Sequence, residues 1–71
     1  MTSSFSGYLD VKGAGIFEGD LIRELSDDKS KPFEIKFINN KFQIYIDERI
    51  SYPLNIDNII DNEFIVVGRI K

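Results

Sequence analysis

The feature that most constrains the fold is a regular alternation of apolar and polar residues on either side of Asn39-Asn40. Residues 33–38 and 41–47 carry an apolar side chain at every second position over most of their length. This period of two predicts strands that turn one face to a core and the other to water. Asparagine tolerates the left-handed conformation of a tight turn, so the pattern predicts a β-hairpin that turns at Asn39 and Asn40.

Shorter strands and turns are indicated before this hairpin. Residues 5–11 predict a first, irregular strand, and residues 12–15 a turn in which glycines adopt positive φ without steric cost. Residues 20–25 predict a second strand, with Leu21 and Leu25 entering the core. Gly19 is expected where the chain bends or where another backbone approaches. A polar loop follows, closed by a proline that favours an extended conformation for the residue before it.

Three further elements are indicated after the hairpin. Residues 49–54 contain a proline, so an irregular crossing is expected there. Three isoleucines between residues 56 and 60 recur at intervals of three and four, which predicts one helical turn capping the core. Asn55 or Asp57 would cap its N-terminus. Residues 64–70 predict a last strand, whose apolar side chains on both faces are typical of a central strand or of a tightly curled sheet.

These elements predict an all-β fold: a single small barrel or roll of about five strands with one short helical turn. The chain of 71 residues is too short for a second hydrophobic core, so residues 1–71 form one domain. Residues 1–4 are expected to be frayed. We expect Phe37, Phe42, Ile44 and Val66 to belong to the core.

Composition excludes several functional classes. The chain has no cysteine and no histidine, so disulfides, thiolate metal sites and the commonest general base are absent. It shows no signal-peptide pattern and no apolar run long enough to span a bilayer. A soluble, cytoplasmic protein without a cofactor, and not an enzyme, is therefore expected. The net charge of −3 disfavours a general affinity for nucleic acid, which requires clustered Lys and Arg.

Adjacent carboxylates raise the question of a metal site. Asp27-Asp28 and Asp47-Glu48 lack the regularly spaced oxygen ligands and the glycine of a calcium loop. Solvated loop charge is therefore the better interpretation of both pairs. The segment from Asp57 to Glu63 is acidic and contains no basic residue. It is either a polar cap over the core or a contact surface, and the cap is the favoured interpretation.

The segment GAGIFEGDLI, residues 13–22, is similar to the second half of a motif in LexA-type self-cleaving peptidases. In that family the nucleophilic serine precedes the isoleucine by six residues, a place that Asp10 occupies here. A carboxylate cannot be activated by a lysine to attack a peptide bond as a serine hydroxyl can. The chain is also too short for that peptidase fold. We therefore expect no peptidase activity.

A second resemblance covers nearly the whole chain, from about Gly7 to Ile70. It rests on three segments, IFEGDLI at residues 16–22, IKF at residues 35–37 and FIVVGRI at residues 64–70. Their order and spacing resemble those of YopX-type phage proteins. The resemblance implies an SH3-like barrel encoded by a phage or prophage and brings no catalytic residues. Two departures are a shorter, more glycine-rich turn before Ile16, and Arg69 where asparagine is frequent in that family.

The outward face of the hairpin is the predicted contact surface for a protein partner. It consists of Tyr45 and Asp47, together with Glu48 and Tyr52 where the chain leaves the strand. Aromatic side chains with a polar tip are enriched in interface cores, and acidic neighbours suit a basic partner from the host or the phage. The competing interpretations are cross-strand packing for Tyr45 and packing across the barrel mouth for Tyr52.

Three functional classes remain open from the sequence. A non-catalytic protein-interaction module that modulates a host protein is favoured. The alternative is a nucleic-acid-binding barrel, whose local basic stripe would consist of Lys29, Lys31, Lys36 and Lys41. An enzyme ranks last, because catalysis would rest on carboxylates, lysine or tyrosine alone.

Overall fold

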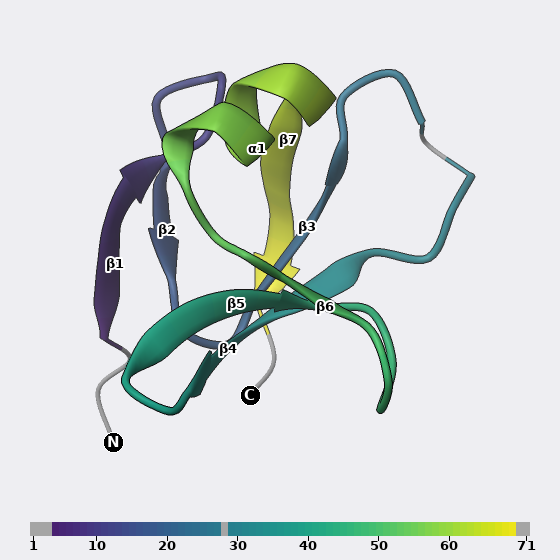
Figure 1. Ribbon diagram of the computed structural model, residues 1–71. Helices are drawn as coiled ribbons and strands as arrows, with labels where there is room; N and C mark the ends of the chain where they lie inside the picture. The colour runs from purple at the N-terminus through teal and green to yellow at the C-terminus, as the bar shows by residue number, and fades with distance from the viewer. Residues whose placement is uncertain (1–3, 28, 70–71) are drawn as a thin grey trace.

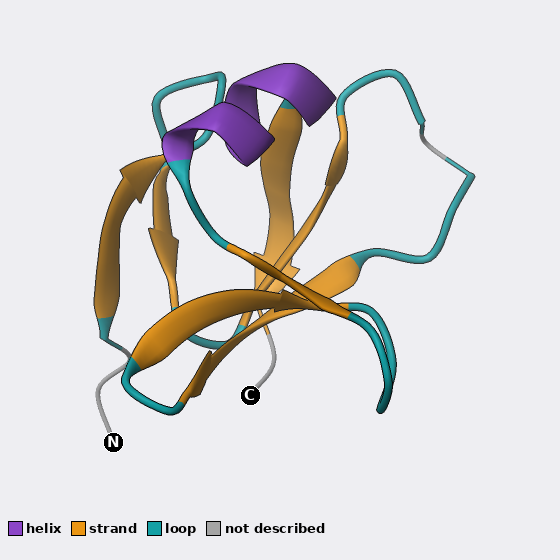
Figure 2. Cartoon of the chain, in the orientation of Figure 1, coloured by secondary structure: helices purple, strands orange, loops and turns teal. Residues whose placement is uncertain are grey.

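The computed structural model describes residues 4–27 and 29–69 of the chain. Its elements are β1 (Phe5–Leu9), β2 (Gly15–Phe17), β3 (Asp20–Glu24), β4 (Phe33–Ile38), β5 (Lys41–Tyr45), β6 (Ser51–Pro53), α1 (Ile56–Asn62) and β7 (Phe64–Arg69). Strands β1 and β2 form a two-stranded sheet, and the other five form a second sheet in the order β6-β5-β4-β3-β7 (Figure 1). The prediction of an all-β fold with one short helix is confirmed (Figure 2).

The described residues contain seven strands rather than about five, because two short strands escape the sequence pattern. Strand β2 begins at Gly15, which we expected to lie in a turn. Strand β6 contains Pro53, which indicated an irregular crossing. Its position at the edge of the larger sheet explains how a strand accepts this proline, since an edge strand can leave one side of its backbone unpaired.

The hairpin of β4 and β5 has the predicted position and turn. Phe37 pairs with Phe42, and Ile38 with Lys41, directly before the turn. Asn39 and Asn40 have φ angles of 54° and 63°. Positive φ at both central residues characterises the type I′ turn, whose twist matches that of the flanking strands. The hairpin prediction is confirmed.

Helix α1 is short and is capped at both ends. The side chain of Asn55 accepts a hydrogen bond from the backbone N–H of Asn58 at 2.8 Å, so Asn55 is the N-cap. Glu63 is the C-cap in a left-handed conformation with φ of 52°. Among the isoleucines that predicted the helix, only Ile59 is buried. The helix therefore covers the core with one side chain and leaves its other apolar residues exposed.

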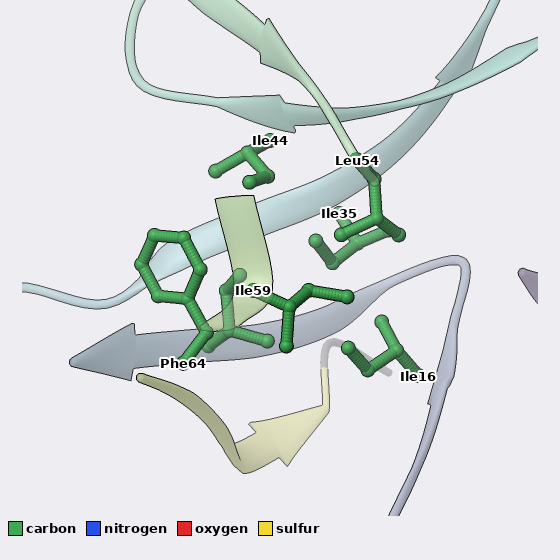
Figure 3. Close-up of a cluster of buried hydrophobic side chains, with 7 residues drawn as sticks. Ile16, Ile35, Ile44, Leu54, Ile59 and Phe64 are labelled. Atoms are coloured by element: carbon green, nitrogen blue, oxygen red, sulfur yellow. The ribbon is translucent and has the colours of Figure 1, made fainter. Parts of the chain in front are cut away.

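The core is built mainly from isoleucines, which are contributed by both sheets and by the helix. One buried cluster contains Ile16, Ile22, Ile35, Ile44, Leu54, Ile59 and Phe64. Figure 3 shows these side chains pointing toward one another. The core assignment of Ile44 is confirmed, whereas Phe42 and Val66 are partly buried and pack against the cluster.

Three expected core residues, Phe37, Leu21 and Leu25, lie outside the core cluster. Phe37 is 44% exposed, because it belongs to the last residues before the hairpin turn, and its ring packs on Phe42 with centroids 4.8 Å apart. Leu25 is 42% exposed in the loop after β3, and Leu21 is only partly buried. The buried side chains of β3 are instead Asp20 and Ile22. Strand β3 therefore presents to the core the face opposite to the one that we expected.

Gly19 combines the two roles that were considered for it. Its φ of 88° places it in a tight bend between β2 and β3. Its backbone N–H donates to the carbonyl of Ile35 at 2.8 Å, so a second backbone also approaches. This bend directs Asp20 into the interior.

Strand β7 forms one edge of the larger sheet rather than its centre. The segment after β1 covers it, since the N–H of Val11 donates to the carbonyl of Phe64 at 3.2 Å. Ile70, the expected end of this strand, lies outside the described residues. Residues 1–3 of the expected frayed segment do so too, while the carbonyl of Ser4 accepts from the N–H of Glu18 at 2.9 Å.

The positive φ of Asn40 generates a stability prediction. Asn40→Gly should leave the free energy of unfolding unchanged or raise it by about 0.5–1 kcal/mol, because glycine adopts positive φ without strain. Asn40→Pro should lower it by about 3 kcal/mol or more, because proline is fixed at negative φ. Urea denaturation of both variants would measure the difference, and equal midpoints would contradict the turn.

Candidate functional site

The predicted contact residues do not form one surface, because Tyr45 and Tyr52 lie on opposite faces of the sheet. Tyr52 of β6 pairs with Ile44 of β5, and Tyr45 pairs with Ser51. Directly opposed residues share a face of an antiparallel pair. Ile44 is buried in the core, so Tyr52 stands on the inward face while Tyr45 stands on the outward one.

Each tyrosine has a structural environment of its own. The Nζ of Lys36 lies 4.0 Å from the centroid of the Tyr45 ring, a cation–π contact across the outward face of the hairpin. Tyr52 lines a hollow of about 320 Å³, which is bordered also by Phe33, Ile46 and Phe64. The contact of Tyr45 is therefore the cross-strand packing of the competing interpretation, whereas Tyr52 is 54% exposed.

The two acidic residues between the tyrosines lie in the loop that joins β5 to β6. The carboxylate of Asp47 accepts hydrogen bonds from the backbone N–H groups of Arg49, at 2.8 Å, and Ile50, at 3.0 Å. Asp47 therefore stabilises the loop, as an aspartate commonly does in turns. Glu48 is exposed in the same loop. The four predicted residues are thus divided between an outward face, a loop and an inward face.

The lysines of the alternative nucleic-acid interpretation are also separated. Lys36 and Lys41 share the outward face of the hairpin, on which Glu34 stands beside Lys36. Lys29 and Lys31 are exposed in the loop before β4. The stripe therefore combines a strand face that carries an acidic residue with a separate loop.

Asp10, which occupies the place of the peptidase nucleophile, is buried and accepts several backbone hydrogen bonds. Its Oδ1 accepts from the N–H groups of Lys12, at 2.9 Å, and Ala14, at 2.8 Å. Its Oδ2 accepts from the N–H of Val66 at 2.9 Å. Both carboxylate oxygens are therefore engaged in holding the turn after β1 against β7.

Asp20, in the GDL part of the same segment, is fully buried and has a comparable role. Its Oδ2 accepts from the N–H of Phe17 at 2.8 Å, and its Oδ1 lies 2.7 Å from the Nε of Arg69. The guanidinium of Arg69 also lies over the Phe17 ring, 5.2 Å from its centroid. The EGD motif of this chain therefore places an ion pair between the bend after β2 and the end of β7.

The remaining carboxylate pair is explained in part by its loop. Asp27 accepts from the Ser30 hydroxyl at 2.6 Å and from the Ser30 backbone N–H at 3.1 Å, and these bonds lower the pKa of Asp27. Asp28 lies outside the described residues. Over residues 4–27 and 29–69, His, Cys, Asp and Glu side chains form no group of three or more that could hold a metal ion.

A group of exposed apolar side chains lies where α1 meets the end of β1. We name it the helix-side patch, and it consists of Leu9, Val11, Ile56 and Ile60. These side chains are 40–59% exposed. They line one hollow of about 340 Å³, together with Tyr8 and the buried Ile59. Figure 1 shows the end of β1 and the following turn beside the helix.

Acidic side chains border this patch on the helix. Asp57 and Asp61 each follow a patch isoleucine by one residue, and both are exposed. The last turn of the helix contains no basic residue. Lys12, in the turn next to Val11, carries the opposite charge on the strand side of the hollow. The patch is thus apolar in the middle and acidic along its helical border.

Sequence reasoning missed this patch and both buried aspartates. The isoleucine spacing predicted the helix, but it did not indicate that a helix of seven residues would bury only Ile59. Aspartate is seldom fully buried, so a single carboxylate among glycines and apolar residues gave no signal for Asp10 or Asp20. The acidic segment from Asp57 was considered as a contact surface, and the exposed apolar residues beside it were the missing observation.

Comparison with known proteins found no match to any protein-family model, to any curated protein or to any solved structure. Within the described parts of the chain, no helix is long and apolar enough to cross a membrane.

The hydrogen bonds of Asp10 generate a second stability prediction. Asp10→Asn should lower the free energy of unfolding by about 1–3 kcal/mol, because the amide would turn an N–H₂ group toward one of the backbone N–H donors. Asp10→Ala, which removes every acceptor, should cost about 3 kcal/mol or more. Asp61→Asn, an exposed carboxylate of the helix, is the matched control and should change stability by less than about 0.5 kcal/mol. Wild-type stability of Asp10→Asn in urea denaturation would contradict this role.

Proposed function

We propose that this chain is a non-catalytic protein-binding module whose contact surface is the helix-side patch. The observation that carries the proposal is the exposure of Leu9, Val11, Ile56 and Ile60 around one hollow. Scattered apolar residues are ordinary on protein surfaces, whereas a contiguous group with a polar rim marks interaction sites. The patch holds four of the eleven large hydrophobic side chains that are exposed in the described residues.

The chemistry of the chain supports a binding role over a catalytic one. Histidine and cysteine are absent from the sequence. The buried carboxylates of Asp10 and Asp20 accept hydrogen bonds from backbone N–H groups or from Arg69, so they are committed to the fold. The resemblance to YopX-type phage proteins supports the same proposal, and it makes a host or phage protein in the cytoplasm the expected partner.

The geometry favours this patch over the hairpin surface that the sequence indicated. The hairpin surface would need Tyr45 and Tyr52 to face one partner, and they stand on opposite sides of the sheet. A nucleic-acid partner receives less support, because Glu34 shares the face of Lys36 and the net charge is −3. The helix-side patch needs no rearrangement to become a continuous contact surface.

The proposal predicts which surface substitutions abolish capture of a partner. Affinity capture from a lysate of cells that express the chain would compare wild type with Ile60→Gln and Ile50→Gln. Ile60 and Ile50 are 58% and 43% exposed, so both variants should fold. We expect a protein that is retained by wild type and by Ile50→Gln. The captured amount of this protein should fall at least about tenfold with Ile60→Gln, because truncating a central apolar anchor costs on the order of 1.4 kcal/mol or more of binding free energy.

A nuclease-treated lysate serves as the second arm of this experiment. Protein capture that survives nuclease and depends on Ile60 would support the proposal. Binding that disappears with nuclease treatment would favour the nucleic-acid alternative. Capture of the same protein by folded Ile60→Gln at the wild-type level would place the contact surface elsewhere.

A further inference from the structure

We infer that the segment that docks on the helix-side patch is a basic amphipathic helix of another protein. This inference rests on the proposed function and deepens it by naming the chemistry of the partner. It follows from three properties of the patch: the spacing of its apolar side chains, the charge along its border and the irregularity of the neighbouring strand.

The apolar side chains have the spacing that a helix recognises. Ile56 and Ile60 are one helical turn apart, about 6 Å along the axis of α1. Leu9 and Val11 border the hollow from the opposite side, and the buried Ile59 forms part of its lining. A row of side chains beside a hollow is the geometry into which another helix packs with residues at intervals of three and four.

The charge of the border selects a basic partner. Asp57 and Asp61 form a second row beside the row of Ile56 and Ile60, displaced by one residue along the helix. Both carboxylates are exposed, and neither has a side-chain hydrogen bond within the described residues. A docked helix with Lys or Arg beside its apolar face would place cations along this row. Such complementary charges raise the association rate and favour the correct partner.

The same charges disfavour a second copy of this chain as the occupant. In a symmetric dimer the same patch faces itself, so the acidic rows of the two copies would come close together. The net charge of −3 on each copy adds a general repulsion. Self-association through the patch is therefore the less favourable arrangement.

An extended strand is disfavoured as the occupant by the shape of β1. Its pairing with β2 shifts register between Phe5 and Leu9, and Gly7 within this interval has a φ of 88°. The backbone N–H of Tyr8 donates to the Ser6 hydroxyl at 3.1 Å. Bulges of this kind prevent another strand from adding to a sheet edge. The patch therefore offers side-chain contacts rather than a backbone ladder.

Selection from a peptide library tests the chemistry of the occupant without knowledge of the natural partner. A display library of random peptides of about 16 residues, long enough for four helical turns, would be selected on wild-type protein after depletion on an Ile56→Gln/Ile60→Gln variant. We expect enriched peptides with apolar residues at intervals of three and four and a net positive charge. Circular dichroism should show that their helicity rises on binding.

The outcomes separate this inference from the proposed function. Patch-dependent peptides that are acidic, that are rich in proline, or in which apolar and polar residues alternate would overturn the inference. They would leave the proposed function intact. Absence of any patch-dependent peptide would count against both. Sedimentation that shows a dimer of the wild type but not of the Ile56→Gln/Ile60→Gln variant would assign the patch to a second copy and would overturn the inference.

A pair of charge variants tests the acidic row with an enriched peptide as the probe. Asp57→Asn/Asp61→Asn should weaken binding on the order of fivefold at low salt, since each exposed ion pair contributes little. The loss should shrink as salt is added. Glu18→Gln/Glu48→Gln changes the net charge equally at exposed sites outside the patch, and it should leave the Kd nearly unchanged. Equal effects of the two double variants would show that net charge, and not the row, attracts the peptide, and would overturn the assignment.

Discussion

The fold depends most on the carboxylate of Asp10, which joins segments that are far apart in the sequence. One oxygen organises the turn after β1, and the other binds the backbone of Val66 in β7, 56 residues away in the chain. Strand β7 is the edge of the larger sheet, and β1 belongs to the smaller one. A buried anion that accepts backbone N–H groups from both segments fixes how the two sheets meet. Asp20 and Arg69 repeat this connection at the other end of β7.

The segment GAGIFEGDLI is explained by these two aspartates. Asp10 lies before it and holds its glycine-rich turn, while Asp20 lies within it and receives the N–H of Phe17. Between them, Ile16 is fully buried in the core cluster. The likeness to a peptidase motif therefore arises from a structural corner, in which glycine permits the bend and aspartate accepts the N–H groups that the bend leaves free.

The parts that could be predicted from the sequence are those governed by local patterns. The hairpin followed from alternation and from Asn39-Asn40, and the helix followed from isoleucine spacing and the Asn55 cap. The prediction of which face of β3 points inward was wrong. Burial of Asp20 depends on Arg69 and on the Phe17 backbone, which the local sequence does not indicate. The separation of the four candidate contact residues could not be predicted for a similar reason. Tyr52 was expected beside the outward face, and its place on the inward face follows from the register of β6, a strand that the proline in that segment did not indicate.

The helix-side patch is the place where local preferences of the chain conflict with its stability. Asp61 and Glu63 lie at the end of a helix where negative charge is unfavourable. Glu63 holds a left-handed conformation that glycine would adopt without strain. Ile56 and Ile60 keep apolar surface in water beside them. Local choices that oppose stability are expected where function requires them. A basic helix would bury Ile56 and Ile60 and would pair with the acidic row that contains Asp61, so the exposed apolar surface and the charge of Asp61 become favourable in the complex. The rest of the molecule supplies the rigid base, because the core cluster and the two buried aspartates hold α1 and β1 in the arrangement that forms the patch.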